Sequence, residues 1–192
     1  QFYEDLAFVS SLPNFTILTP ADGNQMYKAV RYAAEIKGPV YIRGGSGREA
    51  DVFAPEAPFS LDGITVLKEY GTDAVIFSNG FVLDRVMAAA EELKARGVNV
   101  TVADINILYG KNPQKILDVM AKTDCVVTVE DHNINGGLGS YISRLATEHK
   151  PVRVKRIALT DYAESGAAKE LGDRYGFSPT GIAEETLKAL GK

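Results

Sequence analysis

In the second half of the chain, apolar positions follow two different periods, which predict buried strands and amphipathic helices in turn. Residues 125–129 (Cys-Val-Val-Thr-Val) form an apolar run that is too short for a helix and too apolar for a half-exposed strand. We therefore predict a strand buried on both faces of a parallel sheet. A polar cluster at 130–133 follows, then a glycine-rich run at 135–140, and then apolar residues at helical spacing from Leu138 to Ala146.

The same alternation extends from residue 62 to the end of the chain. The pattern predicts strands at 64–70, 74–77, 98–103, 125–129 and 152–157, and helices at 81–96, 113–121, 138–146 and 180–190. Strands that alternate with helices in this way are typical of a mostly parallel sheet with right-handed crossovers. The predicted fold class is therefore α/β, with a mostly parallel sheet in the C-terminal domain.

The first 48 residues carry fewer elements. A helical period spans 2–12, short strands are predicted at 15–18 and 40–42, and Asp22 with Gln25 predicts the start of a helix that reaches residue 36. Two strands and one crossover helix do not make a stable domain alone. We therefore interpret 1–48 as the tail of a second α/β domain, 49–61 as a proline-containing linker without any period, and 62–192 as the C-terminal domain.

Composition and charge narrow the class of protein. Hydrophobic residues at 45% and charged residues at 24% are ordinary for a globular protein. The net charge of −4 argues against a nucleic-acid binder, and the single cysteine fits a reducing, cytoplasmic setting. No apolar run approaches the roughly 18 residues that span a bilayer, so no membrane partner is expected. Because the chain begins at Gln1 in the middle of a pattern, we expect a fragment or a processed subunit.

The polar cluster is the first candidate for chemistry, because open α/β sheets meet ligands or partners at the carboxyl ends of their strands. Glu130 and Asp131 lie beside His132, where they would raise its pKa or orient a ring nitrogen. One histidine with two acids is weak as a metal site. We expect His132 to be a hydrogen-bonding residue of a loop or interface, with a catalytic base as the alternative.

The glycine-rich run favours a packing turn that opens a helix over a dinucleotide-binding loop. The third glycine of a dinucleotide motif would fall at Ile142, and the run follows a late strand. Such a turn is expected to leave the first helical N–H groups open to a neighbour. Ile134 is apolar in an otherwise polar loop, and we expect its burial against a partner; the alternative is that it folds back onto its own domain.

Arg43 is the second candidate. It ends a predicted strand and enters the glycine-rich loop at 44–47, which suits the binding of a phosphate or carboxylate. The alternative is a solvated arginine at a strand end. Cys125 lies among valines and is expected to be an inert core thiol.

Several motifs together resemble the C-terminal portion of transketolase-type enzymes, which depend on thiamine diphosphate. Residues 1–7 (QFYEDLA), 12–14 (LPN), 20–24 (PADGN) and 38–43 (GPVYIR) look like the closing part of the family's pyrimidine-binding domain. Residues 129–132 (VEDH) with 136–140 (GGLGS) are similar to the signature of its C-terminal domain. The Asp-His pair favours transketolase over the related deoxyxylulose-phosphate synthases and 2-oxo acid dehydrogenase β chains.

The resemblance implies transfer of two-carbon ketol units between sugar phosphates, with thiamine diphosphate and a divalent metal such as magnesium. Arg43 matches the family arginine that grips the sugar phosphate, and Glu130, Asp131, His132 and Ile134 are expected to serve assembly or docking. The family's cofactor-activating glutamate and its diphosphate- and metal-binding domain have no counterpart here. No catalytic, cofactor or metal residue is therefore expected, and the chain alone is expected to be inactive.

Partners follow from the same resemblance. They are sugar-phosphate substrates, the N-terminal part or subunit of the same enzyme, and further copies in a homodimer or higher oligomer. Two alternatives stay open. One is a non-catalytic dimerisation module, and the other is part of a related thiamine-diphosphate enzyme such as deoxyxylulose-phosphate synthase.

Overall fold

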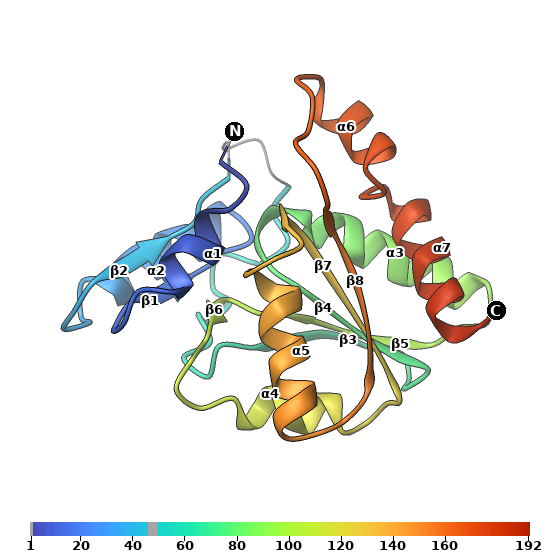
Figure 1. The fold of residues 1–192 in the computed structure, drawn as a ribbon, viewed down its shortest axis with the longest axis horizontal. Coiled ribbons are helices and arrows are strands. Elements are labelled where there is room, and N and C mark those ends of the chain that lie inside the picture. The colour runs from blue at the N-terminus through green and yellow to red at the C-terminus, as the bar shows by residue number, and fades with distance from the viewer. Residues whose placement is uncertain (1, 46–49) are drawn as a thin grey trace.

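The larger sheet of the protein consists of five strands in the order β3-β5-β4-β7-β8 (Figure 1). The computed structural model describes residues 2–45 and 50–192. Its sheet strands are β3 Thr65–Glu69, β4 Ala74–Ser78, β5 Val100–Asp104, β7 Cys125–Asn133 and β8 Arg153–Leu159. β3 runs antiparallel at one edge, and the other four strands are parallel. The predicted α/β class with a mostly parallel sheet is confirmed.

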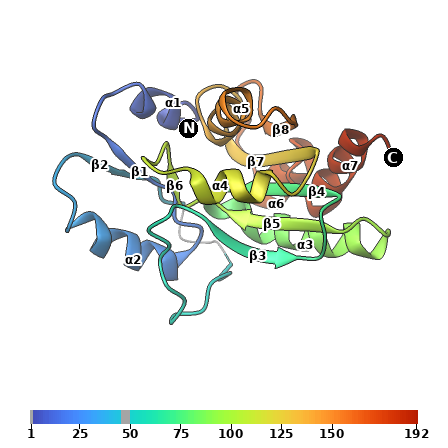
Figure 2. The same cartoon turned by 90° about the horizontal axis from the view of Figure 1, so that it is seen from below.

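Helices cover both faces of this sheet (Figures 1 and 2). α3 Leu83–Ala95 and α7 Pro179–Leu190 share one apolar core with the strands. α4 Gln114–Met120 and α5 Leu138–Glu148 share a second core on the other face. Successive side chains of a strand point to opposite faces, so the fully buried β4 needs both helical layers.

A smaller sheet joins the N-terminal segment to the middle of the chain. β1 Thr16–Leu18 pairs in parallel with β2 Val40–Ile42 and antiparallel with β6 Ile107–Leu108. α1 Asp5–Ser10 precedes β1, and α2 Gly23–Ala33 connects β1 to β2. β6 was not predicted, because two residues are too few to show a period. Residues on either side of the 49–61 segment therefore share one sheet.

The predicted start of α2 is confirmed. Oδ1 of Asp22 accepts the N–H of Gln25 at 2.8 Å. Its Oδ2 accepts the N–H groups of Val52 and Phe53 at 2.8 and 2.7 Å. One side chain therefore caps the helix and also fixes the segment that precedes the larger sheet.

Besides β6, three elements differ from the sequence-based expectation. The structure adds a short 3-10 turn, η1 Gly80–Val82, before α3 and a helix, α6 Ala168–Arg174, between β8 and α7. β7 continues beyond the apolar run through the polar cluster. Within the described ranges, no helix is long and apolar enough to cross a bilayer. The second half of the predicted loop at 44–47 lies outside the described residues.

Candidate functional site

The polar cluster at 130–133 belongs to the carboxyl end of β7. The sequence pattern had placed it in a loop after the strand. The N–H of Asn133 donates to the carbonyl of Tyr3 at 2.8 Å, and Asn133 is the register partner of Leu159 in β8. The β7–β8 register shifts between Val129 and Asn133. Pairing with Leu159 of β8 beyond this irregularity therefore extends the strand, and the hydrogen bond to Tyr3 ties its end to the N-terminal segment.

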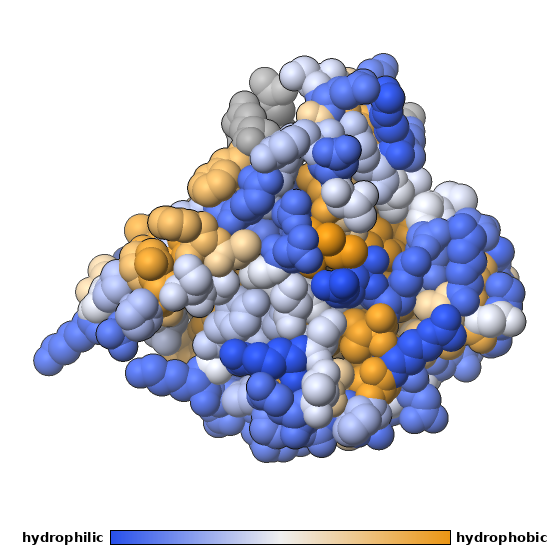
Figure 3. Space-filling view, in the orientation of Figure 1, coloured by the Kyte–Doolittle hydropathy of each residue, from blue (hydrophilic) through white to orange (hydrophobic). Residues whose placement is uncertain are grey.

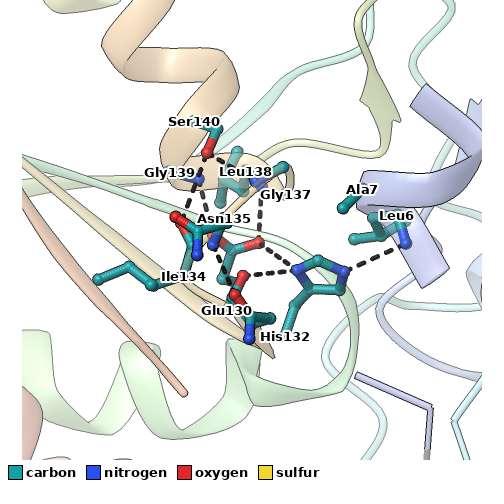
Figure 4. Close-up of polar contacts among 12 residues, drawn as sticks. Leu6, Ala7, Glu130, His132, Ile134, Asn135, Gly137, Leu138, Gly139 and Ser140 are labelled. Carbon is teal, nitrogen blue, oxygen red and sulfur yellow. Dashed lines mark hydrogen bonds and ion pairs between the residues drawn. The ribbon is translucent and has the colours of Figure 1, made fainter. Parts of the chain in front are cut away.

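Glu130 caps the helix that follows it (Figure 4). Its Oε2 accepts the N–H of Leu138 at 2.6 Å, and its Oε1 accepts the N–H of Gly139 at 2.8 Å. The expectation that these helical N–H groups stay open to a neighbour is wrong, because a side chain of the same chain already pairs with them. Burial raises the pKa of Glu130 to about 7, and the two backbone N–H groups limit that rise.

Two glycines make this arrangement possible. A Cβ at Gly137 would lie 2.0 Å from Oε2 of Glu130, so a side chain there would displace the capping carboxylate. Gly136 has a φ of 84°, and its Cβ would lie 2.2 Å from Cβ of Ala7. The glycine-rich run is therefore a packing turn, and it packs against α1.

His132 is buried between Glu130 and α1 (Figure 4). Its Nε2 accepts the N–H of Leu6 at 3.1 Å, so Nδ1 carries the proton and donates to the carbonyl of Asn133 at 2.7 Å. Burial lowers the pKa of His132, and nearby Asp5 opposes that effect. The imidazole is therefore a neutral acceptor that fixes the first turn of α1.

Arg43 connects three parts of the site. Its Nε donates to Oδ2 of Asp5 at 2.9 Å, and its Nη1 donates to Oδ1 of Asp131 at 2.7 Å. Tyr41, from the same strand, donates its hydroxyl to Asp5 at 2.7 Å, and burial together with Asp5 raises the pKa of Tyr41 to about 12. The Arg43 side chain is 13% exposed, so the alternative of a solvated arginine is wrong. Its phosphate role stays a prediction.

The arrangement joins chain segments and does not present a free reactive group. Both ring nitrogens of His132, both oxygens of Glu130 and the guanidinium of Arg43 are engaged in hydrogen bonds. In the part of the chain that the structure describes, no three His, Cys, Asp or Glu side chains are grouped to hold a metal ion. These residues therefore do not fit the binding of a diphosphate and its metal ion.

The remaining predicted residues lie nearby but have different surroundings. Ile134 is half-buried, and its side chain points away from Glu130 and His132 (Figure 4). Its carbonyl accepts from Nη1 of Arg156 at 3.1 Å. Cys125 is buried in the apolar core, as expected.

Asp5, Leu6 and Tyr41 are site residues that sequence reasoning missed. Asp5 was only one acid of a helical pattern, and Tyr41 was only a strand residue. Leu6 and His132 are 126 positions apart in the sequence. No local signal indicates such a pairing.

Comparison with known proteins gives consistent matches over the whole chain. Residues 63–182 match the family model described as the transketolase C-terminal domain. A 1-deoxy-D-xylulose-5-phosphate synthase from Caldanaerobacter subterraneus subsp. tengcongensis is 33% identical over 96% of this chain, which spans 30% of that relative. One subunit of an apulose-4-phosphate transketolase, from Actinobacillus succinogenes, is 27% identical over 96% of this chain and 60% of its own length.

One solved structure is similar over the entire chain. It is described as a split-gene transketolase in an inactive β4 tetramer, and it superposes with a TM-score of 0.93 at 34% identity. The match covers 100% of this chain and 63% of that one. The chain therefore spans well under the full length of each of these relatives.

Proposed function

The chain belongs to the family of transketolase C-terminal domains, and on that premise we propose that it is the C-terminal part of a transketolase. Combined with the rest of the enzyme, it would serve the transfer of two-carbon ketol units between sugar phosphates. In this proposal, residues 1–48 close a pyrimidine-binding domain, 49–61 form a linker and 62–192 form the C-terminal domain. The proposed setting is cytoplasmic, in keeping with a single free cysteine.

One observation carries the proposal. The split-gene transketolase structure shares the fold of the entire chain at 34% identity, including the short segment before the linker. That relative's name says that a transketolase can be encoded in separate pieces. The relative from Actinobacillus is likewise named as one subunit of its enzyme. A division of this enzyme between chains therefore agrees with both names.

Thiamine diphosphate and a divalent metal such as magnesium belong to the proposal only for the complete enzyme. The described residues offer no group of metal ligands, and the N–H groups at the start of α5 are capped by Glu130. Calorimetric titration of the isolated chain with cofactor and magnesium is therefore expected to show no saturable heat. Submillimolar binding by the isolated chain would contradict this division of roles.

A second function is favoured by a specific observation. The synthase from Caldanaerobacter is 33% identical over nearly the whole chain, so synthesis of deoxyxylulose phosphate is the alternative reaction. The test is to combine the chain with the complementary subunit of a split-gene transketolase, thiamine diphosphate and magnesium. Exchange of two-carbon units between ketose and aldose phosphates would support the transketolase reaction. Formation of deoxyxylulose phosphate instead would support the synthase.

We also propose that Arg43 contributes to recognition of the substrate phosphate. Because Asp5 and Asp131 hold its guanidinium, a phosphate has to share it or displace one carboxylate. In the complete enzyme, Arg43→Lys is then expected to weaken phosphorylated substrates about tenfold or more and to spare unphosphorylated ones, since a point charge replaces a bidentate fork. Equal losses for both substrate types would assign Arg43 to structure alone.

Assembly with the rest of the enzyme and with further copies is the proposed role of the surface around α1. Phe2 and Phe8 are each 61% exposed, and apolar side chains gather at this end of the molecule (Figure 3). Exposed apolar patches of this kind mark interaction surfaces. We propose that the half-buried Ile134 and Asp131 belong to the same docking region, and that the buried Glu130 and His132 serve docking by holding the turn and α1 in place beneath it.

Ile134→Asp tests this docking role. We expect weaker association in sedimentation and an unchanged melting temperature of the monomer. The control is Leu61→Asp, at an exposed apolar position outside the proposed docking region. Lost stability with normal association would make Ile134 merely structural. A normal oligomer with abolished turnover would place the residue in the active site.

A further inference from the structure

A small cavity of about 160 Å³ lies at the carboxyl ends of β4, β7 and β8. Phe81 and Val82 follow β4, Asp131 lies two residues before the end of β7, and Leu159 ends β8. The helix after β4 covers one face of the sheet, and the helix after β7 covers the other. The cavity therefore lies where the connections change faces, which is the place where open α/β sheets bind ligands.

Two other parts of the chain complete the wall. Tyr3 comes from the segment before α1, and the long connection from β8 to α7, which carries α6, closes the outer side. Gly172 of this connection lies against the guanidinium of Arg85, which also lines the cavity. Apolar atoms are visible at the foot of this connection (Figure 3). Cavities between separate chain segments are preferred positions for small-molecule sites.

The wall is mostly apolar and includes the carboxylate of Asp131. Oδ1 and the carbonyl of Asp131 accept from Arg43 at 2.7 and 3.2 Å. No other described residue donates to Oδ2, the backbone N–H of Asp131 bonds its own carboxylate, and the side chain is 19% exposed. Because Oδ1 is held by Arg43, Oδ2 is the carboxylate oxygen left as an acceptor for a molecule in the cavity that Asp131 lines.

We infer that this cavity binds a small uncharged molecule with an aromatic or branched apolar body and one hydroxyl group that donates to Oδ2 of Asp131. A cavity of roughly 150 Å³ with apolar walls admits a molecule of the size of benzene. An uncharged ligand suits a wall that already contains one acidic and one basic side chain, Asp131 and Arg85. This inference does not depend on the reaction proposed above.

Asp131 connects this cavity to the candidate site. Its other oxygen holds Arg43, which in turn holds Asp5 at the start of α1. Tyr3 lines the cavity, and its carbonyl accepts the N–H of Asn133. A bound molecule is therefore expected to slow hydrogen exchange at the Asn133 and Leu6 amides. That effect would give the ligand control over how firmly α1 is attached.

The test compares phenol with toluene, which has the same shape without the hydroxyl group, on the full 192-residue chain. Titration followed by NMR should show saturable shifts at Leu159 and Phe177 with phenol. Toluene would cover Oδ2 without pairing with it, so phenol is expected to bind about tenfold more tightly. Asp131→Asn should reduce that ratio several-fold.

Ala163→Leu fills the cavity and should abolish binding, and Ala88→Leu, at an exposed alanine of α3, is the matched control. If Ala163→Leu does not fold, Leu171→Trp fills the same space from the outer connection. Equal affinities for phenol and toluene would overturn the role of Asp131. Failure of the folded chain to bind phenol, or undiminished phenol binding by a filled variant, would overturn the site itself.

Discussion

The carboxyl ends of β7 and β5 each place an acidic side chain in the interior, and they treat it differently. Glu130 of β7 is 1% exposed, and both of its oxygens accept backbone N–H groups of α5. Asp104 of β5 is 0% exposed, and among the described residues neither of its oxygens has a hydrogen-bond partner. Burial raises the pKa of Glu130 to about 7, and burial together with Asp22 raises the pKa of Asp104 well above its usual range.

The difference shows that the residues after a strand determine whether a buried carboxylate has hydrogen-bond donors. After Glu130, the glycine-rich turn returns two N–H groups to the carboxylate, so the charged form is partly stabilised. After Asp104, the chain continues into β6 and returns no donor. Backbone donors therefore limit the rise in the pKa of Glu130, whereas no donor opposes the rise that burial causes in the pKa of Asp104. The predictions below test this contrast, from the largest expected effect to the smallest.

The largest loss is expected where the end of β7 is tied to α1. Arg43→Met leaves the carboxylates of Asp5 and Asp131 without their cation, and breaking such a buried pair costs about 3–5 kcal/mol. The control is Arg96→Met, because the exposed ion pairs of Arg96 are worth less than about 1 kcal/mol. Urea unfolding of both variants measures the difference. Equal small losses in the free energy of unfolding of the two variants would mean that Arg43 does not hold α1 to the end of β7.

Glu130→Gln is expected to cost about 2–3 kcal/mol, because the amide group has one acceptor and would face one backbone N–H with its own donors. Glu148→Gln, at an exposed position of the same helix, is the control and should change stability by less than about 0.5 kcal/mol. Chemical denaturation at pH 8, where Glu130 is charged, gives the comparison. A neutral Glu130→Gln would contradict its role as the cap of α5.

Asp104→Asn is expected to raise the free energy of unfolding, in contrast to the two substitutions above. The pKa of Asp104 is raised in the folded state, so the folded state binds more protons than the unfolded chain above about pH 4, and stability falls as the pH rises. Asparagine does not titrate, so it removes this pH dependence of stability. We expect Asp104→Asn to raise the free energy of unfolding by about 1–2 kcal/mol at pH 7 and not to change it at pH 4. Unfolding curves measured across this range test it. A loss at pH 7 would show that a charged Asp104 has a partner in solution.

The smallest effect concerns His132 and pH. Burial lowers its pKa, so the unfolded chain binds more protons below about pH 6.5, and this contribution to stability is lost as the pH falls through the folded pKa. Protonated Nε2 cannot accept the N–H of Leu6. Two acids face the ring: Oδ1 of Asp5 lies 3.7 Å from Nε2, and Oε2 of Glu130 lies 4.0 Å from Nδ1.

We therefore expect the hydrogen-exchange protection of Leu6 to fall about fivefold between pH 7 and pH 5, corresponding to about 1 kcal/mol. The core amide of Val127 in β7 is the internal control and should keep its protection. An unchanged Leu6 would mean that the imidazole does not hold α1.

The candidate site was only partly predictable. Glu130, Asp131 and His132 could be found because a polar cluster directly follows an apolar strand and precedes glycines. Their partners could not, since Asp5 and Leu6 lie in a short helix at the other end of the chain. Asp104 directly followed a predicted strand, without any sign that its oxygens would lack partners among the described residues. Partners distant in sequence follow from packing, and periodicity does not report them.

The sequence by itself determined the α/β class, the strands of the larger sheet and the N-cap of α2 at Asp22, because these depend on local periods and on groups a few residues apart. Only the tertiary structure decided that β7 runs on to Asn133, that β6 joins the smaller sheet, and that Glu130 closes the helix start expected to be open. Each of these outcomes satisfies a backbone or carboxylate group that burial removes from water. Which donor or acceptor is in reach depends on how distant segments pack.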